Sequence, residues 1–389
     1  MARKGKKRGK IRIDFRPNLE KPGRKGSTIW TKRLQDEPLE IGDAQTSEAL
    51  TGKGKLTRKK TVDQARTSPA ELERWAEGET LSESQWREGT VVAIFGLYIK
   101  VDDGERMRNC VVRRVLKSLL LDQRNVATVG DHVCFTPIGD EEGVIERIGE
   151  RHGRLLRRYR HQEHLIVTNI DQALIIASVA EPELRIHLVD RYIVAALAGS
   201  LKPVIVFNKV DLPHDKPLDE YERVYASLGY EVLRTSVTET IGLEALRDVM
   251  KDRKSVLAGV SGVGKSSLVN AIEPGLSLAV HPVNRATGRG THTTTLVQLL
   301  KLSFGGYVVD TPGIRQFAFW NIDRRNMEMY FEEFVPYVPR CKFADCTHIH
   351  EDNCAVKQAV EDEQIAPWRY DSYAKIFDDQ MEFLETWEK

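Results

Sequence analysis

The chain has 389 residues, an apolar fraction of 41% and a formal net charge of +1, which suits a globular protein of two to four domains. No apolar run approaches the roughly 18 residues that a membrane span needs, and no hydrophobic segment follows the basic N-terminus, so the sequence predicts a cytoplasmic protein without a secretory signal. Five cysteines, three of them between Cys341 and Cys354, favour a metal site in a reducing compartment over a disulfide framework.

The charge is unevenly distributed along the chain. Residues 1–33 contain thirteen Lys or Arg and two acids, Asp14 and Glu20, so this arm carries +11 and the remainder carries −10. A basic arm on an acidic body predicts a polyanionic partner, nucleic acid rather than membrane, because no amphipathic apolar face accompanies the arm. The alternative is an arm that stays solvated. We assign residues 1–85 to a basic extension and expect it to be disordered when alone.

Short strand-like runs follow from Glu88 to about Ile148. The runs are GTVVAIF, LYIKVDD, MRNCVVR, DHVCFTPI and GVIERIG, and Gly and Asp turn signals separate them. Five strands in about 60 residues predict a small barrel, which we place at residues 86–153. Cys110 and Cys134 lie in these strands and are expected to be small core residues.

Strands and helices alternate from Ile170 onward, which predicts a parallel sheet with helices on both faces, within a domain at residues 154–330. The expected strands are residues 172–179, 203–207, 230–236 and 255–260, and the expected helices are residues 186–198, 218–229 and 243–250. After the run YVVDTPG the pattern becomes helical and aromatic, and a charged helix starts near Ala366. We assign residues 331–389 to a C-terminal domain.

The segment GVSGVGKS, from Gly259 to Ser266, fits the phosphate-loop pattern G-x-x-x-x-G-K-[ST] between a strand and a helix. Its glycines let backbone amides turn inward around a phosphate, where the helix N-terminus adds its positive end. Lys265 is predicted to bridge the β- and γ-phosphates, and Ser266 to bind Mg²⁺. The alternative is a glycine-rich turn without a ligand.

A base-recognition motif precedes this loop in the chain. Asn208, Lys209 and Asp211 form N-K-V-D after an apolar strand. The Asp211 carboxylate can accept from both N1–H and the exocyclic amine of guanine, which predicts about 10²- to 10⁴-fold discrimination against adenine. Ser236, in the following TS pair, is predicted to support recognition of the guanine O6.

Two candidate switch segments follow the phosphate loop. The run GRGTHTTT offers Thr293 or Thr294 as a further hydroxyl ligand of Mg²⁺, although a threonine-rich strand entry is the alternative. The run VVDTPG places Asp310 at the end of an apolar strand, as expected of an acid that holds Mg²⁺, and Gly313 would contact the γ-phosphate.

The position after D-T-P-G bears on catalysis. Ras-type GTPases place there a Gln that orients the attacking water, whereas this chain has Ile314, which cannot form a hydrogen bond. The water must therefore be positioned by another group or by a partner. His292 in the first switch run is the best local candidate, and a role in contacting RNA or solvent is its alternative.

The run CKFADCTHIHEDNC offers three thiols and an imidazole, which close a tetrahedral zinc shell and leave no open position, so the predicted site is structural. Cys341, Cys346 and Cys354 are three of the ligands, and either His348 or His350 is the fourth. The alternative is a set of free thiols without metal.

The order base motif, phosphate loop, switch threonines and D-T-P-G resembles that of the circularly permuted GTPases. With a barrel before it and a Cys/His cluster after it, the chain resembles the RsgA (YjeQ) family of small-subunit biogenesis GTPases over about residues 86–380. The resemblance implies an N-terminal OB-type β-barrel, a central permuted α/β P-loop GTPase domain and a C-terminal zinc-binding helical domain. It favours His348 over His350, and it explains the reversed motif order by a cut before the base-binding half.

The sequence thus predicts a GTP hydrolase that binds the small ribosomal subunit late in maturation, with ribosome-stimulated turnover. GTP or GDP, Mg²⁺ and Zn²⁺ are the expected cofactors, and the small subunit and its rRNA are the expected partners of a monomer that binds no membrane. One alternative is a GTP-gated RNA-binding switch with incidental hydrolysis. Another is an ATP-dependent kinase, against which Asp211 argues.

The site residues fall into three predicted groups. The catalytic residues are His292, Lys265, Thr293 and Thr294. The nucleotide-binding residues are Asn208, Lys209, Asp211, Ser236, Gly259, Gly262, Val263, Gly264, Lys265, Ser266, Ser267, Asp310 and Gly313. The metal ligands are Cys341, Cys346, His348 and Cys354 for zinc, and Ser266, Thr294 and Asp310 for magnesium.

Overall fold

The computed structural model describes residues 50–51, 55–56, 85–113, 126–159, 162–276, 297–310 and 324–387. Contacts divide the chain into two units, Met1–Asp63 and Gln64–Lys389. In the first unit, β1 (Leu50–Thr51) and β2 (Lys55–Leu56) pair antiparallel, and the basic arm lies outside the described residues. No helix within the described ranges combines the length and apolar composition needed to cross a bilayer.

Five strands form the barrel that the sequence predicts. They are β3 (Arg87–Phe95), β4 (Tyr98–Asp102), β5 (Met107–Val112), β6 (His132–Ile138) and β7 (Glu142–Ile148). The order is β3-β4-β5-β7-β6, and pairing of β3 with β6 closes the barrel. The pair β5–β7 is parallel, whereas the other pairs of described barrel strands are antiparallel.

Side-chain alternation along the strands fills the barrel. Val91, Val101, Cys110 and Phe135 are fully buried in its core, which confirms the prediction for Cys110. The prediction for Cys134 is wrong. Its neighbours in β6 point inward, so alternation turns Cys134 outward, where it is half-buried with its Sγ 3.4 Å from Arg147 Nη2.

A hairpin that the sequence analysis did not predict lies between the barrel and the parallel sheet. It consists of β8 (Leu155–Tyr159) and β9 (Gln162–Val167), which pair antiparallel. Val167, the last residue of β9, forms an isolated β-bridge with Val129, which precedes β6 in the chain.

The predicted parallel sheet is present, in the order β12-β11-β10-β13-β15-β14. Its strands are β10 (Gln172–Ser178), β11 (Lys202–Asn208), β12 (Glu231–Thr235), β13 (Lys254–Ala258), β14 (Gln298–Lys301) and β15 (Tyr307–Asp310). The first five strands in this order pair parallel, whereas β14 at the edge is antiparallel to β15.

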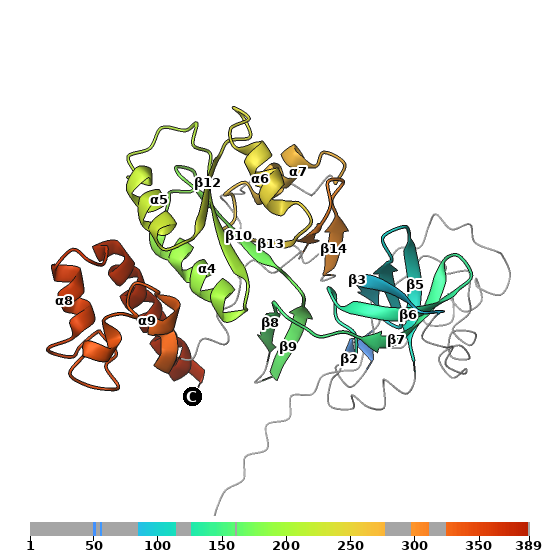
Figure 1. Cartoon of the computed structure of the whole chain (residues 1–389), viewed down its shortest axis with the longest axis horizontal. Helices are drawn as coiled ribbons and strands as arrows, with labels where there is room; N and C mark the ends of the chain where they lie inside the picture. The colour runs from blue at the N-terminus through green and yellow to red at the C-terminus, as the bar shows by residue number, and fades with distance from the viewer. Residues whose placement is uncertain are drawn as a thin grey trace, which may run out of the picture. The chain divides into compact units, whose positions relative to one another are not determined.

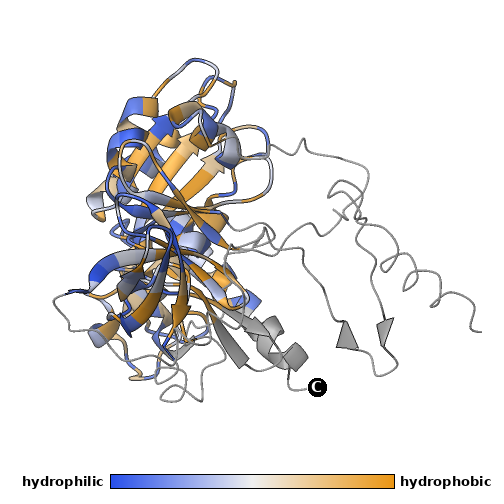
Figure 2. Ribbon diagram, turned by 90° about the vertical axis from the view of Figure 1, so that its right-hand side faces the viewer, coloured by the Kyte–Doolittle hydropathy of each residue, from blue (hydrophilic) through white to orange (hydrophobic). Residues whose placement is uncertain are grey.

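Helices cover both faces of this sheet (Figure 1). They are α4 (Ile186–Ala198), α5 (Leu218–Ser227), α6 (Leu243–Met250) and α7 (Lys265–Ile272). One core joins α4 and α5 to Ile175 and Ile205, and another joins α6 and α7 to the alternate residues Leu174 and Val204. Figure 2 shows the hydrophobic strands between helices that carry hydrophilic residues.

The barrel and the parallel sheet form one continuous eleven-stranded sheet. A single register pair, Gln298 with Ala93, joins β14 to β3. Beside it, Val92 of β3 packs into the core that contains Leu299 and Val309. The barrel is therefore attached to the edge strand β14.

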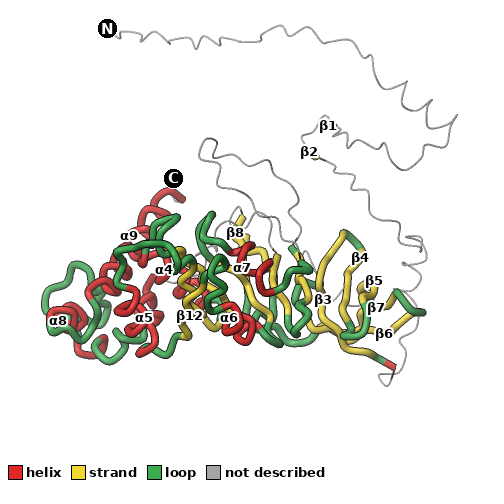
Figure 3. Tube along the Cα trace, turned by 90° about the horizontal axis from the view of Figure 1, so that it is seen from above, coloured by secondary structure: helices red, strands yellow, loops and turns green. Residues whose placement is uncertain are grey.

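We call residues 324–387 the C-terminal module. It contains η2 (Arg324–Tyr330), η3 (Val338–Arg340), α8 (Ala355–Glu361) and α9 (Pro367–Trp387). In Figure 3 these helices are linked by loops, and the described part of the module contains no strand. Its core is aromatic, with Phe331, Phe334 and Tyr373 buried against Val194 of α4. Helix α9 begins at Pro367, close to the predicted start, because proline suits the first turn of a helix.

Candidate functional site

The phosphate-loop segment connects β13 to α7, as the sequence predicts. Gly259, Gly262 and Gly264 have φ values of +137°, +88° and +98°, which residues with a Cβ rarely adopt. A Cβ on Gly264 would lie 2.4 Å from Asn208 Nδ2, and one on Gly259 would lie 2.2 Å from Ile176 O. Both glycines are therefore required by conformation and by close packing.

Lys265 opens α7 and turns its ammonium group back into the loop. Its Nζ donates to the carbonyl oxygens of Gly259 (2.9 Å) and Val260 (2.8 Å). Burial lowers the pKa of Lys265, because desolvation disfavours the charged form. Ser266 and Ser267 follow in the first turn of the helix and are half-buried.

The base motif and the phosphate loop are in direct contact, although 55 residues separate Asn208 from Val263. Asn208 Nδ2 donates to Val263 O at 2.8 Å, and Lys209 Nζ donates to Gly262 O at 2.9 Å. Lys209 also donates to Glu181 O and has a φ of +63°. These side-chain contacts bring the two motifs together, although the base motif precedes the phosphate loop in the chain.

The TS pair lies at the end of β12 and contacts the predicted base motif. Thr235 Oγ1 donates to Asn208 Oδ1 at 3.0 Å and is buried, so it fixes the amide that holds the phosphate loop. The sequence analysis missed Thr235, although it stands directly before Ser236. Ser236 is buried and accepts from the amide of Glu239, whereas Asp211 is exposed in the loop after Lys209.

Asp310 ends β15, whose other residues pair with β13, so the acid lies at the same edge of the sheet as the phosphate loop. It is half-buried, and Gln298 Nε2 donates to its Oδ2 at 3.3 Å. The other predicted switch residues, His292, Thr293, Thr294 and Gly313, lie outside the described residues.

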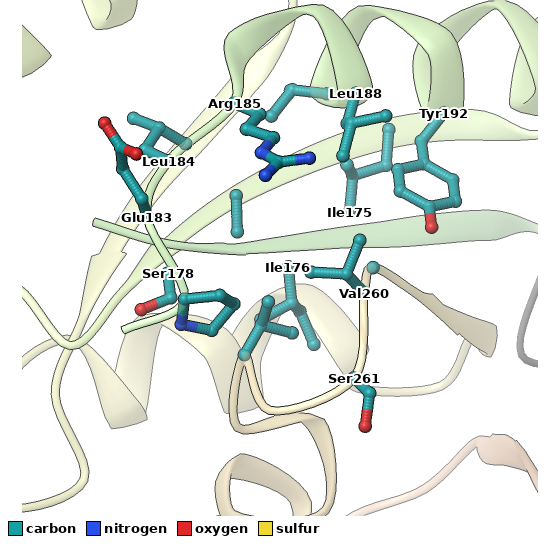
Figure 4. Close-up of a pocket in the computed structure, with 15 residues that line it drawn as sticks. Ile175, Ile176, Ser178, Glu183, Leu184, Arg185, Leu188, Tyr192, Val260 and Ser261 are labelled. Carbon is teal, nitrogen blue, oxygen red and sulfur yellow. The ribbon is translucent and has the colours of Figure 1, made fainter. Parts of the chain in front are cut away.

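A cavity of about 280 Å³ borders the phosphate loop between β10 and α4. Figure 4 shows Arg185, Leu188 and Tyr192 reaching into it from the α4 side, and Val260 from the loop. Its walls are mostly apolar. The buried Ser178 Oγ on its wall has no hydrogen-bond partner among the described residues.

The Cys/His cluster brings together the four predicted zinc ligands. The ligand atoms of Cys341, Cys346, His348 and Cys354 all lie within 4.8 Å of one another. His348 Nδ1 is 3.6 Å from Cys341 Sγ and 3.4 Å from Cys354 Sγ, so this nitrogen faces the thiols. His350 is exposed and does not belong to the cluster, which resolves the alternative in favour of His348.

The surroundings of the cluster fix its loop and fit a metal. Tyr370 and Tyr373 of α9 donate to the carbonyls of His348 and Thr347 at 2.7 and 2.8 Å. Burial raises the pKa of Cys346 to about 12, so a metal cation would be needed to keep this thiol ionised at neutral pH. Three thiols and one imidazole are the donor set of a structural zinc site.

Comparisons with known proteins agree with this geometry. The family model for the RsgA GTPase matches residues 148–320. The small ribosomal subunit biogenesis GTPase RsgA of Thermotoga neapolitana is 39% identical over 294 residues, covering 75% of this chain and 96% of the relative. The protein of the same name from Chlorobaculum tepidum is 38% identical over 313 residues, covering 77% and 98%.

Two solved structures are similar over most of the chain. The crystal structure of YjeQ from Thermotoga maritima has a TM-score of 0.63 and 36% identity, and the match covers 76% of this chain and 99% of that one. The crystal structure of YloQ, described as a circularly permuted GTPase, has a TM-score of 0.58 and 29% identity, with coverage of 78% and 97%.

Proposed function

Because the chain belongs to the RsgA GTPase family, we propose that it hydrolyses GTP and acts in the biogenesis of the small ribosomal subunit. The observation that carries the proposal is the contact between the base motif and the phosphate loop, through Asn208 and Val263. Such a contact supports binding of one nucleotide by both motifs at once. Turnover of GTP and of ATP, with and without small ribosomal subunits, tests the proposal, and turnover of ATP alone would refute it.

In this proposal the loop amides and Lys265 bind the β- and γ-phosphates. Ser266 and Asp310 hold Mg²⁺ with Thr293 or Thr294, and Gly313 contacts the γ-phosphate. Bound Mg²⁺ would neutralise charge on the phosphoryl oxygens during in-line attack by water. The Lys265 ammonium already lies inside the loop, so a phosphate there would replace the carbonyl contacts with Gly259 and Val260.

Guanine recognition is assigned to Asp211, with Lys209 covering the base and Ser236 on its O6 side. Asp211→Asn should weaken GTP binding by about 10²-fold or more, because an amide nitrogen replaces one of two acceptor oxygens. The variant should accept xanthosine triphosphate, which carries an oxygen where guanine has its amine. Competition binding with fluorescent nucleotides measures both effects. Asp215→Asn, an exposed acid of the same loop, is the control. Unchanged GTP affinity in the Asp211 variant would remove Asp211 from the site.

The proposed domain bounds and partners are based on the charge distribution and the fold. We assign residues 86–153 to an OB-fold barrel, 154–330 to the permuted GTPase domain and 331–389 to the zinc-binding domain. We expect rRNA to be contacted by the barrel, the zinc-binding domain and the arm of residues 1–33. The protein would act as a monomer in the cytoplasm. Zinc would be structural, because the four donors leave no open coordination position.

Catalysis is assigned to His292, because Ile314 cannot orient water. Slow hydrolysis by the protein alone and stimulation by small subunits are expected. His292→Ala should lower stimulated single-turnover hydrolysis about 10²-fold or more and leave GTP affinity nearly unchanged. His214→Ala, which removes an exposed imidazole elsewhere, is the control. A wild-type rate on subunits would exclude His292 and leave the GTPase proposal standing.

A further inference from the structure

The β14–β15 hairpin (Gln298–Asp310) is held at both of its ends by side chains. Its two strands pair through four residues each, from Gln298 with Asp310 to Lys301 with Tyr307. The first pair lies at the phosphate-loop edge of the sheet. The last pair contacts the barrel through Tyr307 and Asp102, and the first pair contacts it through Gln298 and Ala93 of β3.

At the nucleotide end, the contact partner of Asp310 is a neutral amide. Gln298 Nε2 donates to Asp310 Oδ2 at 3.3 Å, across the register pair that the backbone already forms. Both residues are half-buried. A carboxylate that accepts one hydrogen bond from a neighbouring strand is restricted in its rotation, and its second oxygen stays available to a cation.

At the other end, the barrel supplies a buried carboxylate. The Asp102 side chain is 1% exposed and forms an ion pair of 2.9 Å with Lys301 Nζ. It also accepts from Tyr307 Oη at 2.8 Å and from the amide of Gly104 at 2.9 Å. A buried carboxylate needs such donors, so the contact joins the barrel firmly to the last residue pair of the hairpin.

We propose that Gln298 is a positioning residue for the Asp310 carboxylate, and that Asp102 of the barrel holds the hairpin on which both residues stand. The inference rests on the proposed role of Asp310 in holding Mg²⁺. Hydrogen bonds to ligating carboxylates orient them, and their loss typically lowers metal affinity 10- to 100-fold. Strands β14 and β15 have four residues each, so only a few residues separate the barrel contact of Tyr307 from Asp310.

The test compares Gln298→Met, which keeps the length of the side chain and removes its donor, with Ser303→Ala in the turn of the same hairpin. The measured quantity is the Mg²⁺ concentration that half-maximally slows the release of fluorescent GDP from the full chain. Gln298→Met should raise it about tenfold, whereas Ser303→Ala should leave it unchanged. GDP affinity in excess chelator should be the same in all variants, which a general loss of structure would not allow.

Asp310→Asn distinguishes the proposed Mg²⁺-holding role of Asp310 from the positioning role of Gln298. If Asp310→Asn raises the half-maximal Mg²⁺ concentration and Gln298→Met does not, the positioning role is wrong and the role of Asp310 stands. If Asp310→Asn leaves the half-maximal Mg²⁺ concentration unchanged, both the role of Asp310 and the positioning role of Gln298 are wrong. An equal effect of Ser303→Ala would also overturn the positioning role, because it would point to the hairpin as a whole.

A separate variant tests the contact between Asp102 of the barrel and the hairpin. Lys301→Met removes the ion pair but leaves Asp102 the hydrogen bonds from Tyr307 and Gly104. It should raise the half-maximal Mg²⁺ concentration by about two- to fivefold, less than Gln298→Met, because the backbone pairs of the hairpin remain. An unchanged value would show that the ion pair between Lys301 and Asp102 does not act on Asp310.

Discussion

Removal of metal from the cluster of Cys341, Cys346, His348 and Cys354 is expected to unfold the C-terminal module and to leave GTP binding nearly intact. Apart from α9, the helices described in the module are short: α8 has seven residues and η3 has three. Helices of this length are not stable alone. Cys354 is itself part of the module's buried core. Binding free energy at such a site appears as folding free energy, on the order of 10 kcal/mol.

Cys346→Ser and strong chelation should therefore give the same result. We expect amide protection to be lost across residues 331–379 in hydrogen exchange, with GTP affinity changed less than about tenfold. Cys134→Ser is the matched control, because Cys134 is a half-buried thiol outside the cluster. Metal content measured on the purified protein should fall in the Cys346 variant alone. Full protection of the module in metal-free protein would contradict the prediction.

Local sequence patterns were sufficient for most of the parallel sheet and its helices. Helix α4 spans Ile186–Ala198 as predicted, because apolar residues repeat at helical spacing and Gly199 follows the last turn. The β8–β9 hairpin escaped prediction because its strands, LLRRY and QEHLIV, lack an alternating apolar pattern. Strand β14 has only four residues, too few to show a period.

The candidate site divides in the same way. The phosphate loop and the base motif are each a short continuous run of residues, so spacing within each run identified Gly259, Lys265 and Asn208. The contacts of Thr235 with Asn208 and of Gln298 with Asp310 depend on which strands pair and in which register. The register of each strand pair depends on packing of the whole sheet, so a short sequence motif does not predict it. Cys134 was misassigned for a related reason, since the inward face of a barrel strand depends on its partners.

The module and the parallel sheet meet at a buried ion pair that no sequence pattern predicts. Asp190 of α4 and Arg369 of α9 form it, and their side chains are 0% and 1% exposed. Tyr225 Oη donates to Asp190 at 2.6 Å, and Glu333 accepts from the same guanidinium. The Arg369 guanidinium also lies 4.6 Å from the ring centroid of Phe331. One residue of α9 thus contacts α4 and the core of the module, and its cation is also 5.7 Å from the Tyr225 ring of α5.

Arg369→Met is expected to lower the free energy of unfolding by about 3–5 kcal/mol, because it leaves the Asp190 carboxylate buried without its cation. Urea unfolding of the zinc-loaded protein measures the loss. The double variant Asp190→Leu with Arg369→Met removes both charges of this pair but leaves Glu333 without its cation, so it should recover part of the loss. Simple loss of packing by the arginine would leave the double variant equally unstable.

The pH dependence of that loss identifies its cause. Burial raises the pKa of Asp190, and the Arg369 cation opposes the rise, so removing the cation should raise the folded-state pKa further. A group whose pKa is higher in the folded state than in the unfolded state costs stability as pH rises above the unfolded value, and the cost disappears as pH falls below it. The difference in unfolding free energy between wild type and Arg369→Met should therefore be largest near neutral pH and should narrow toward acid. A difference that stays constant with pH would mean that Arg369 stabilises the interface by packing and not by its charge.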